Sequence, residues 1–238
     1  MSEAKALQIL GVIPARGGSK GVPRKNIRDL AGKPLLQYTV EAVRGSKLLT
    51  HTVVSTEDAE IEKVSRDLGM EVVPRPMELA GDSVPTLPVI EQVLAELEPV
   101  HGRYDFVVIL QVTTPLRIAE DIDASIKMAI DTGAESVIGV VRVLDHHPSR
   151  VKKITKGRLE DYIPEEDGSR RQDLSPAYVR NGAVYVCRRD LIDRGSLRGK
   201  DRCPYEMPAE RSINIDEKLD FMLAEIVMKG GLEERFGA

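Results

Sequence analysis

The pattern of apolar and polar positions along the first 145 residues predicts alternating strands and helices. Short apolar runs bounded by Gly or Pro predict buried strands at 7–14, 51–56, 70–74, 104–111 and 135–143. Apolar residues at helical spacing predict helices at 34–45, 58–68, 87–97 and 120–130. This alternation is typical of an α/β protein with a doubly wound, mostly parallel, Rossmann-like sheet.

A polar segment at about 145–180 interrupts this pattern, with many turn residues and charges of both signs. Within it, 154–159 is predicted to form a hairpin around Lys156-Gly157. A core strand at 182–188 and an amphipathic helix at 219–231 follow. We therefore interpret 1–238 as a single domain with an insertion of about 35 residues, a length that calls for a function or a partner.

Composition and charge exclude several classes of protein. The net charge is -4, so there is no overall basic field for nucleic acid and any anion site must be local. Cys187 and Cys203 fit neither a metal-ligand spacing nor a disulfide framework, which favours a reducing compartment. The N-terminal residues lack a secretion-signal pattern, and no apolar run approaches the roughly 20 residues of a membrane helix. We expect a cytoplasmic protein without a membrane or nucleic-acid partner.

A loop rich in glycine and cations follows the first predicted strand. The stretch PARGGSKGVPRKN (14–26) contains three glycines among Arg16, Lys20, Arg24 and Lys25. Glycine lets backbone N–H groups approach an anion closely, and the end of a strand is where open α/β sheets bind ligands. The pattern favours a phosphate-binding loop, with a solvated basic loop as the alternative.

The spacing in this loop excludes the two common glycine-rich phosphate motifs. It contains neither the G-x-x-x-x-G-K-[ST] string of a P-loop nor the G-x-G-x-x-G string of a dinucleotide-binding turn. The loop carries more positive charges than are needed to bind the pyrophosphate of a dinucleotide. They suit a nucleoside triphosphate attacked at its α-phosphorus, where cations neutralise both the reacting centre and the departing pyrophosphate.

Several motifs resemble, in order, those of the acylneuraminate cytidylyltransferases, the CMP-sialic acid synthetases and their relatives. They are IPARGGSKGVPRKNIRDLAGKPLL (13–36), VVSTED (53–58), RPMELAGDS (75–83), LQVTTPLR (110–117), HHP (146–148), RNGAVYV (180–186) and SINIDEKLDF (212–221). The resemblance implies a nucleotidyltransferase fold and a homodimer in which the inserted segment helps to complete the neighbour's site. It also implies transfer of CMP from CTP to the anomeric hydroxyl of a nine-carbon α-keto sugar acid, with Mg²⁺ and release of pyrophosphate.

For the opening loop, the resemblance implies that the side chains of Arg16, Lys20 and Lys25 contact the triphosphate. Lys25 and Arg16 are the catalytic candidates, with Lys25 stabilising charge at the reacting phosphorus. The backbone of Ala15 and Gly17 is implied to lie near the cytosine.

Further along the chain, the resemblance implies that Asn26 and Arg75 help to seat the nucleotide. A surface arginine before a proline is the alternative for Arg75. Gln111 ends a predicted strand, where a ligand-facing amide is expected, and is implied to lie near both substrates. Arg117 is either a structural ion-pair partner or a ligand contact.

On the acceptor side, the resemblance implies that the sugar acid contacts Gln111, Arg150, Arg171, Asn181 and Tyr185. Arg171 is the counterpart of the arginine that binds the sugar carboxylate. Tyr185 also has an alternative as a core residue of its strand. The adjacent pair His146-His147 is interpreted as part of a turn, because neighbouring histidines without further ligands make a poor metal site.

The Mg²⁺ ligand is assigned to Asp216, with Asn214 as a doubtful second contact. The family pattern is often D-I-D where this chain reads Asn214-Ile215-Asp216, and alternation places the first and third side chains on one side. Mg²⁺ prefers carboxylate and phosphate oxygens. An N-cap of the last helix is the alternative role for Asp216.

The acceptor and the activity leave alternatives open. Legionaminic, pseudaminic and related acids are alternative acceptors, as is 3-deoxy-octulosonic acid, although the QVTTPLR segment argues against the last. A catalytically silent nucleotide-binding regulatory module is the alternative of a different class. A silent module would be expected to have lost the loop cations or the metal-binding carboxylates. In this chain only Asn214, which stands where the family often has Asp, fits that expectation.

Overall fold

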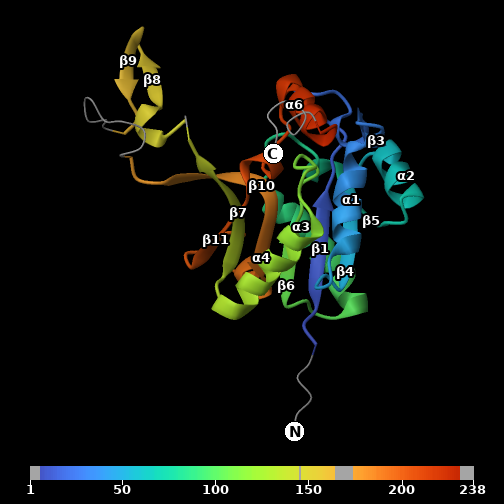
Figure 1. The fold of residues 1–238 in the computed structure, drawn as a ribbon. Helices are drawn as coiled ribbons and strands as arrows, with labels where there is room; N and C mark the ends of the chain where they lie inside the picture. The colour runs from blue at the N-terminus through green and yellow to red at the C-terminus, as the bar shows by residue number, and fades with distance from the viewer. Residues whose placement is uncertain (1–5, 145, 164–173, 231–238) are drawn as a thin grey trace.

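The computed structural model describes residues 6–144, 146–163 and 174–230 and places a seven-stranded sheet at its centre (Figure 1). The strands, in spatial order, are β11 (Arg202–Glu206), β7 (Ser136–Val143), β10 (Ala177–Arg188), β6 (Phe106–Ile109), β1 (Ile9–Pro14), β4 (His51–Thr56) and β5 (Glu71–Pro74). β10 runs antiparallel to both of its neighbours, and the other neighbouring pairs are parallel. The predicted mostly parallel α/β sheet is confirmed.

Helices cover both faces of this sheet. They are α1 (Leu35–Gly45), α2 (Ala59–Asp67), α3 (Thr86–His101), α4 (Ala119–Thr132), α5 (Arg189–Asp193) and α6 (Lys218–Met228). Short 3₁₀ turns are η1 (Lys25–Ile27), η2 (Met77–Leu79), η3 (Pro148–Arg150) and η5 (Ala209–Arg211), and β2 (Asp29–Leu30) pairs with β3 (Lys33–Pro34). Among the described helices, none combines the length and the apolar character that a membrane span requires.

Alternate residues of β1 supply two separate hydrophobic layers. Ile9 and Ile13 pack in a core with residues of α1, α2, α4 and α6, whereas Leu10 and Val12 pack with residues of α3 and α5. Successive side chains of a strand point to opposite faces, so a strand buried on both faces needs apolar residues throughout. This requirement explains the unbroken apolar run that predicted the strand.

Two strands differ from the prediction at the antiparallel side of the sheet. β10 begins at Ala177 rather than at 182, and its first residues are largely exposed, so they carry no apolar pattern. Its pairing with β7 shifts register between Arg180 and Tyr185, which breaks the period further. β11 lies at the sheet edge with alternating exposed residues and a proline, and the sequence did not predict it.

The predicted hairpin in the polar insertion is confirmed as β8 (Lys152–Thr155) paired with β9 (Arg158–Asp161). Lys156 and Gly157 both have positive φ, 51° and 75°, as a two-residue hairpin turn requires. The hairpin projects from the body of the molecule between β7 and β10, at the left of Figure 1. We call residues 146–163 the arm.

Candidate active site

Six of the eight predicted nucleotide-binding residues, all except Ala15 and Gly17, line one cavity of about 550 Å³. Its walls come from the loops after β1, β5 and β6, at the carboxyl edge of the parallel strands, and from the segment before α6. This is the edge at which open α/β sheets bind ligands. The lining includes Arg16, Lys20, Lys25, Asn26, Arg75, Asp82, Gln111, Asn214 and Asp216.

Lys25 is held in this cavity by contacts with the distant segment before α6. Its Nζ donates a hydrogen bond to the carbonyl oxygen of Ile215 at 2.7 Å and lies 3.3 Å from Oδ1 of Asp216. The side chain is only 13% exposed, so its ammonium is fixed rather than free in solvent. A positive charge fixed in advance costs no reorganisation when negative charge develops beside it.

The close approach of the loop to that segment depends on Gly21. A Cβ atom at this position would lie 2.1 Å from the backbone oxygen of Asp216, closer than any van der Waals contact permits. Glycine therefore allows the cationic loop to lie against residues 215–216, which hold the Lys25 ammonium.

Arg16 and Lys20 share one carboxylate partner, Asp82. Nη1 of Arg16 lies 2.5 Å from Oδ1 of Asp82, and the Lys20 ammonium pairs with the other oxygen. Hydrogen bonds from Lys20 and then Arg16 hold the pKa of Asp82 below its usual range. The Asp82 carboxylate thus lies between the two cations, where an anionic ligand would otherwise bind.

Arg24 does not line the cavity and instead anchors the loop to α2. Its guanidinium forms two hydrogen bonds with Asp58, at 2.6 and 2.9 Å, and also pairs with Glu60. The Asp58 carboxylate also accepts the backbone N–H groups of Glu60 and Ile61 and so caps α2. The hydrogen bonds from Arg24 are the main cause that lowers the pKa of Asp58 to about 2.

A second anchor runs through Glu57 and Arg75. Glu57 accepts the backbone N–H of Gly17 at 2.7 Å, and its other oxygen lies 4.0 Å from the buried guanidinium of Arg75. Arg75 also donates to the side chain and the carbonyl of Ser55. Burial lowers the pKa of Arg75, while Glu57 raises it. Arg75 is therefore a buried wall of the cavity and not the surface arginine of the alternative interpretation.

The two predicted backbone contacts lie at the edge of this arrangement. Ala15 is fully buried in the core, and neither Ala15 nor Gly17 lines the cavity. Asn26 is 7% exposed and donates to the carbonyl oxygen of Arg16 at 2.9 Å. Asn26 therefore fixes the backbone of the loop at the start of its cationic run.

Gln111 joins the first cavity to a second one of about 480 Å³, and Pro85 and Thr86 are also common to both. Gly182, at φ 77°, leaves space for the Gln111 side chain, because a Cβ there would lie 2.6 Å from its Oε1. Arg117 is buried and donates to the carbonyl oxygens of Gln111 and Ala183, at 3.1 and 2.7 Å. Burial lowers the pKa of Arg117 to about 10. Arg117 is a structural residue that holds backbone carbonyls.

The second cavity contains two arginines that the sequence did not single out. Arg180 and Arg198 line it together with Tyr185, whose pKa is raised by burial. Arg198 lies in the loop between α5 and β11, and Arg180 precedes the register shift of β10. Arg180 is the first residue of the RNGAVYV motif but received no role, and Arg198 lies outside the motifs, so only the folded chain brings both beside Gln111.

The family model for cytidylyltransferases matches residues 10–195, which include the cationic loop and both cavity-lining strands β6 and β10. The chain belongs to the cytidylyltransferase family.

Individual relatives agree with this assignment. The chain is 34% identical to N-acylneuraminate cytidylyltransferase A of Danio rerio over 93% of its own length, and it spans only 51%, about half, of that curated relative. It is 29% identical to post-translational flagellin modification protein B of Campylobacter coli, covering 93% of this chain and 95% of that one. The fold resembles that of CMP:2-keto-3-deoxy-manno-octonic acid synthetase complexed with CTP, with a TM-score of 0.71, 18% identity and coverage of 94% and 99%.

The remaining predicted acceptor residues of the cytidylyltransferase lie in different places. Tyr185 lines the second cavity. Asn181 is buried and donates to Met207 and Ser212 at 3.1 and 3.0 Å, so its amide lies in the wall and lines neither cavity. Arg150 is exposed at the base of the arm, and Arg171 lies outside the described residues.

The histidine pair of the insertion is part of a turn, as the sequence indicated. His147 caps η3, with its Nδ1 2.8 Å from Oγ of Ser149, and its Nε2 lies 3.0 Å from the carbonyl oxygen of Ser175. Both ring nitrogens of His147 are therefore occupied within the turn.

Asp216 is the carboxylate of the cavity best placed to hold a divalent cation. Its side chain is 68% exposed, and it faces the Lys25 ammonium. It is not the N-cap of α6, which is Glu217, and Asp220 accepts the backbone N–H groups of both residues. Asn214 donates its Nδ2 to Oδ2 of Asp216 at 2.6 Å, while its own Oδ1 is buried. The geometry fits Asp216 as an oxygen ligand and Asn214 as the residue that orients it.

Replacing Asp58 with Asn removes the charge of the loop anchor and keeps its shape. We expect the free energy of unfolding at pH 7 to fall by about 1 kcal/mol, because the partly exposed pair with Arg24 loses its charge assistance. The pKa of Asp58 is lowered from its usual value of about 3.9 to about 2. The difference between wild type and D58N is therefore complete above about pH 4 and is lost as the pH falls toward 2.

Urea unfolding at pH 7, 5 and 3 measures this difference. The matched control is Asp67→Asn, which removes an exposed carboxylate of the same helix that pairs with Lys63 one turn earlier. A D58N variant as stable as D67N at pH 7 would contradict the anchoring role.

Proposed function

We propose that this cytidylyltransferase transfers CMP from CTP to the anomeric hydroxyl of a nine-carbon α-keto sugar acid of the N-acylneuraminate type, releasing pyrophosphate. The observation that carries the proposal is the pair of adjoining cavities that share Gln111. One is lined by Arg16, Lys20 and Lys25, and the other by two arginines. The first suits a triphosphate, and the second suits an acceptor that is itself an anion.

The reaction is a direct in-line displacement. The anomeric oxygen forms a bond to the α-phosphorus, and the bond from that phosphorus to the oxygen bridging the β-phosphate breaks. The bridging oxygen keeps the electron pair and leaves as pyrophosphate. Lys25 neutralises charge at the reacting phosphorus, and Arg16 and Lys20 neutralise the departing pyrophosphate. Two substrates held in adjoining cavities react as a pre-oriented pair.

The divalent cation of the proposal is Mg²⁺, held by Asp216. When bound, it would supply positive charge to the phosphate oxygens. Asn214 keeps the Asp216 carboxylate in place through its amide hydrogen bond. The Lys25 ammonium lies 3.3 Å from the same carboxylate.

The proton of the acceptor hydroxyl passes to solvent in this scheme. Among the described residues that line the first cavity there is no histidine, and the only carboxylates, Asp82 and Asp216, are both paired with cations. Positioning and charge neutralisation therefore supply the catalysis, without a side chain as general base.

A pyrophosphate-release assay with CTP, Mg²⁺ and a panel of sugar acids tests the proposal. The panel comprises N-acetylneuraminic, legionaminic, pseudaminic and 3-deoxy-octulosonic acids. We expect release with N-acetylneuraminic acid and none with CTP alone. If another acid of the panel gives faster release, that acid and not N-acetylneuraminic acid is the acceptor. CTP binding without release for any acid would favour the silent regulatory module.

Replacing Lys25 with Ala removes the ammonium nearest the proposed reacting phosphorus. We expect kcat to fall by about 10²–10³-fold, as for loss of one pre-oriented donor to a transition-state oxyanion. Steady-state kinetics with CTP and the best acceptor measure this. The matched control is Lys33→Ala, which removes an exposed lysine of β3 paired with Glu41 outside both cavities. A K25A enzyme with wild-type kcat would exclude the role given to Lys25.

Replacing Arg198 with Ala tests the acceptor cavity separately. We expect KM for the sugar acid to rise by about 10–100-fold, because a charge-assisted hydrogen bond to its carboxylate is lost. KM for CTP stays close to the wild-type value, since Arg198 does not line the first cavity. Arg194→Ala, which removes an arginine paired with Glu135 outside the cavities, is the control. Equal changes in both KM values would place the acceptor elsewhere.

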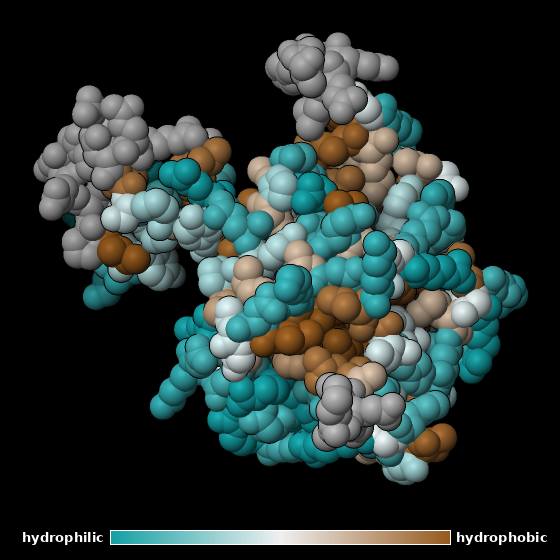
Figure 2. Space-filling view, turned by 60° about the horizontal axis from the view of Figure 1, so that its bottom comes forward, coloured by the Kyte–Doolittle hydropathy of each residue, from teal (hydrophilic) through white to brown (hydrophobic). Residues whose placement is uncertain are grey.

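We further propose that the arm packs against a second copy of the chain in a homodimer. Ile154 and Leu159 are register partners on the hairpin and are 78% and 71% exposed. Figure 2 shows apolar side chains on the surface of the arm, at a distance from the body of the molecule. Exposed apolar residues gathered on a projecting element are typical of a protein interface.

Replacing both Ile154 and Leu159 with Asp places charge on that surface without touching the core. We expect the dimer to dissociate to a monomer that stays folded, as measured by light scattering after gel filtration and by thermal unfolding. Lys156→Glu at the hairpin turn is the control for a change of charge alone. A double variant that remains dimeric, or a monomeric wild type, would refute this assembly.

A further inference from the structure

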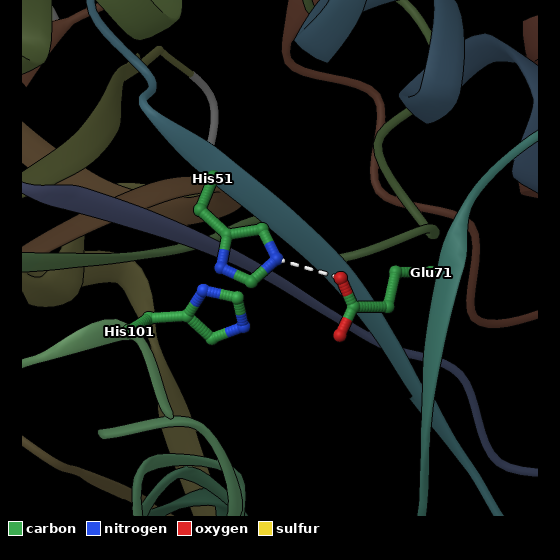
Figure 3. A group of neighbouring side chains, drawn as sticks. All are labelled: His51, Glu71 and His101. Carbon is green, nitrogen blue, oxygen red and sulfur yellow. Dashed lines mark hydrogen bonds and ion pairs between the residues drawn. The ribbon is translucent and has the colours of Figure 1, made fainter. Parts of the chain in front are cut away.

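Three side chains of metal-binding type meet at the end of the sheet opposite the candidate active site. His51 begins β4, Glu71 begins β5, and His101 ends α3 (Figure 3). β4 and β5 are parallel neighbours, so their first residues lie at the same edge. The possible ligand atoms of the three side chains all lie within 4.8 Å of one another. His51 and His101, 50 positions apart in the chain, are thus brought together only by the fold.

The two histidines and the carboxylate are arranged to share one small ligand. Nε2 of His51 lies 2.8 Å from Oε2 of Glu71. The rings of His51 and His101 have centroids 4.7 Å apart and are tilted by 53°. Figure 3 shows the two imidazoles side by side, facing the Glu71 carboxylate. Metal–ligand bonds of roughly 2.0–2.2 Å require ligand atoms about 3–3.5 Å apart, so only small side-chain movements are needed.

Tyr104 contacts the Nδ1 side of the His51 ring and so fixes its orientation. Its hydroxyl lies 2.7 Å from Nδ1 of His51, and the tyrosine is almost fully buried. Because the Glu71 carboxylate accepts from Nε2–H of His51, the Tyr104 hydroxyl donates to Nδ1. With a metal ion at Nε2, the ring proton would lie on Nδ1 and be donated to the Tyr104 oxygen, as second-shell partners accept it from metal-bound histidines.

We propose that His51, Glu71 and His101 form a binding site for a divalent transition-metal ion of the Zn²⁺ class, with water in the remaining position. Two imidazoles and one carboxylate are a ligand set that Zn²⁺ accepts, whereas Mg²⁺ prefers oxygen ligands alone. Glu71 and His101 are exposed, so the ion reaches the site without opening the fold. The site is separate from the oxygen-rich Asp216 position.

The bound ion would tie the end of α3 to two strands of the sheet. β4 runs from His51 to Thr56, so the site lies roughly a strand length, about 17 Å, from the cationic cavity. The ion therefore acts on stability and not on the reacting groups. The inference stands whether or not the proposed cytidylyl transfer is correct.

The experiment uses the full chain without a histidine tag, freed of metal and without nucleotide. Zn²⁺ is titrated by calorimetry in excess Mg²⁺, which occupies oxygen sites, and thermal unfolding is recorded with and without Zn²⁺. We expect one Zn²⁺ per chain with micromolar or tighter affinity and a higher unfolding temperature. Co²⁺ in place of Zn²⁺ gives the visible absorption of a four- or five-coordinate site.

Two variants assign the ligands. His101→Ala removes an exposed ligand at the end of a helix, and we expect Zn²⁺ affinity to fall by about tenfold or more. The matched control is His146→Ala, which removes an exposed histidine of the arm and leaves the affinity unchanged. The proposal is overturned if the wild type binds no Zn²⁺ at micromolar concentration. It is overturned equally if H101A binds as the wild type does, or if H146A loses the ion.

Discussion

The ion pair between Arg24 and Asp58 determines where the functional loop lies. Asp58 caps α2 with the same carboxylate that holds the Arg24 guanidinium, so the loop is fastened to a helix end rather than to another loop. Glu57, the preceding residue, holds the N–H of Gly17. Two successive acids at the end of β4 thus fix both ends of the cationic stretch. Lys25, next to Arg24, is thereby directed into the cavity.

The parts of the fold that the sequence predicted are those with local patterns. β1, β4 and β7 are buried, β-branched runs, and α1, α2 and α4 have clear apolar faces. β11 and the first residues of β10 were not predicted, because exposed edge and arm positions have no apolar period to detect. α3 also extends to His101, beyond the predicted end at 97. The differences at β10 and β11 lie where long-range pairing, and not local burial, decides the structure.

The same division applies to the candidate site. Arg16, Arg75 and Gln111 follow strands and were proposed from the resemblance, which for Arg16 and Gln111 agreed with their expected place at the carboxyl edge of the sheet. The contact between Lys25 and residues 215–216 joins positions 190 or more apart in the chain, and local sequence gives no sign of it. Arg198 was missed for the same reason, and Arg180, although it begins the RNGAVYV motif, was given no role. Asn181, which follows Arg180, has its amide in the wall, so a motif position does not by itself give a side chain's direction.

Asp82 gives the resting protein an internal substitute for its ligand. Because its carboxylate pairs with Arg16 and Lys20, an anion that binds these two cations must displace Asp82 from both. Under the proposed function, a triphosphate would bring enough negative charge to replace Asp82 at both cations and still engage Lys25, whereas inorganic phosphate would bring less. The pairing would then favour ligands of higher charge.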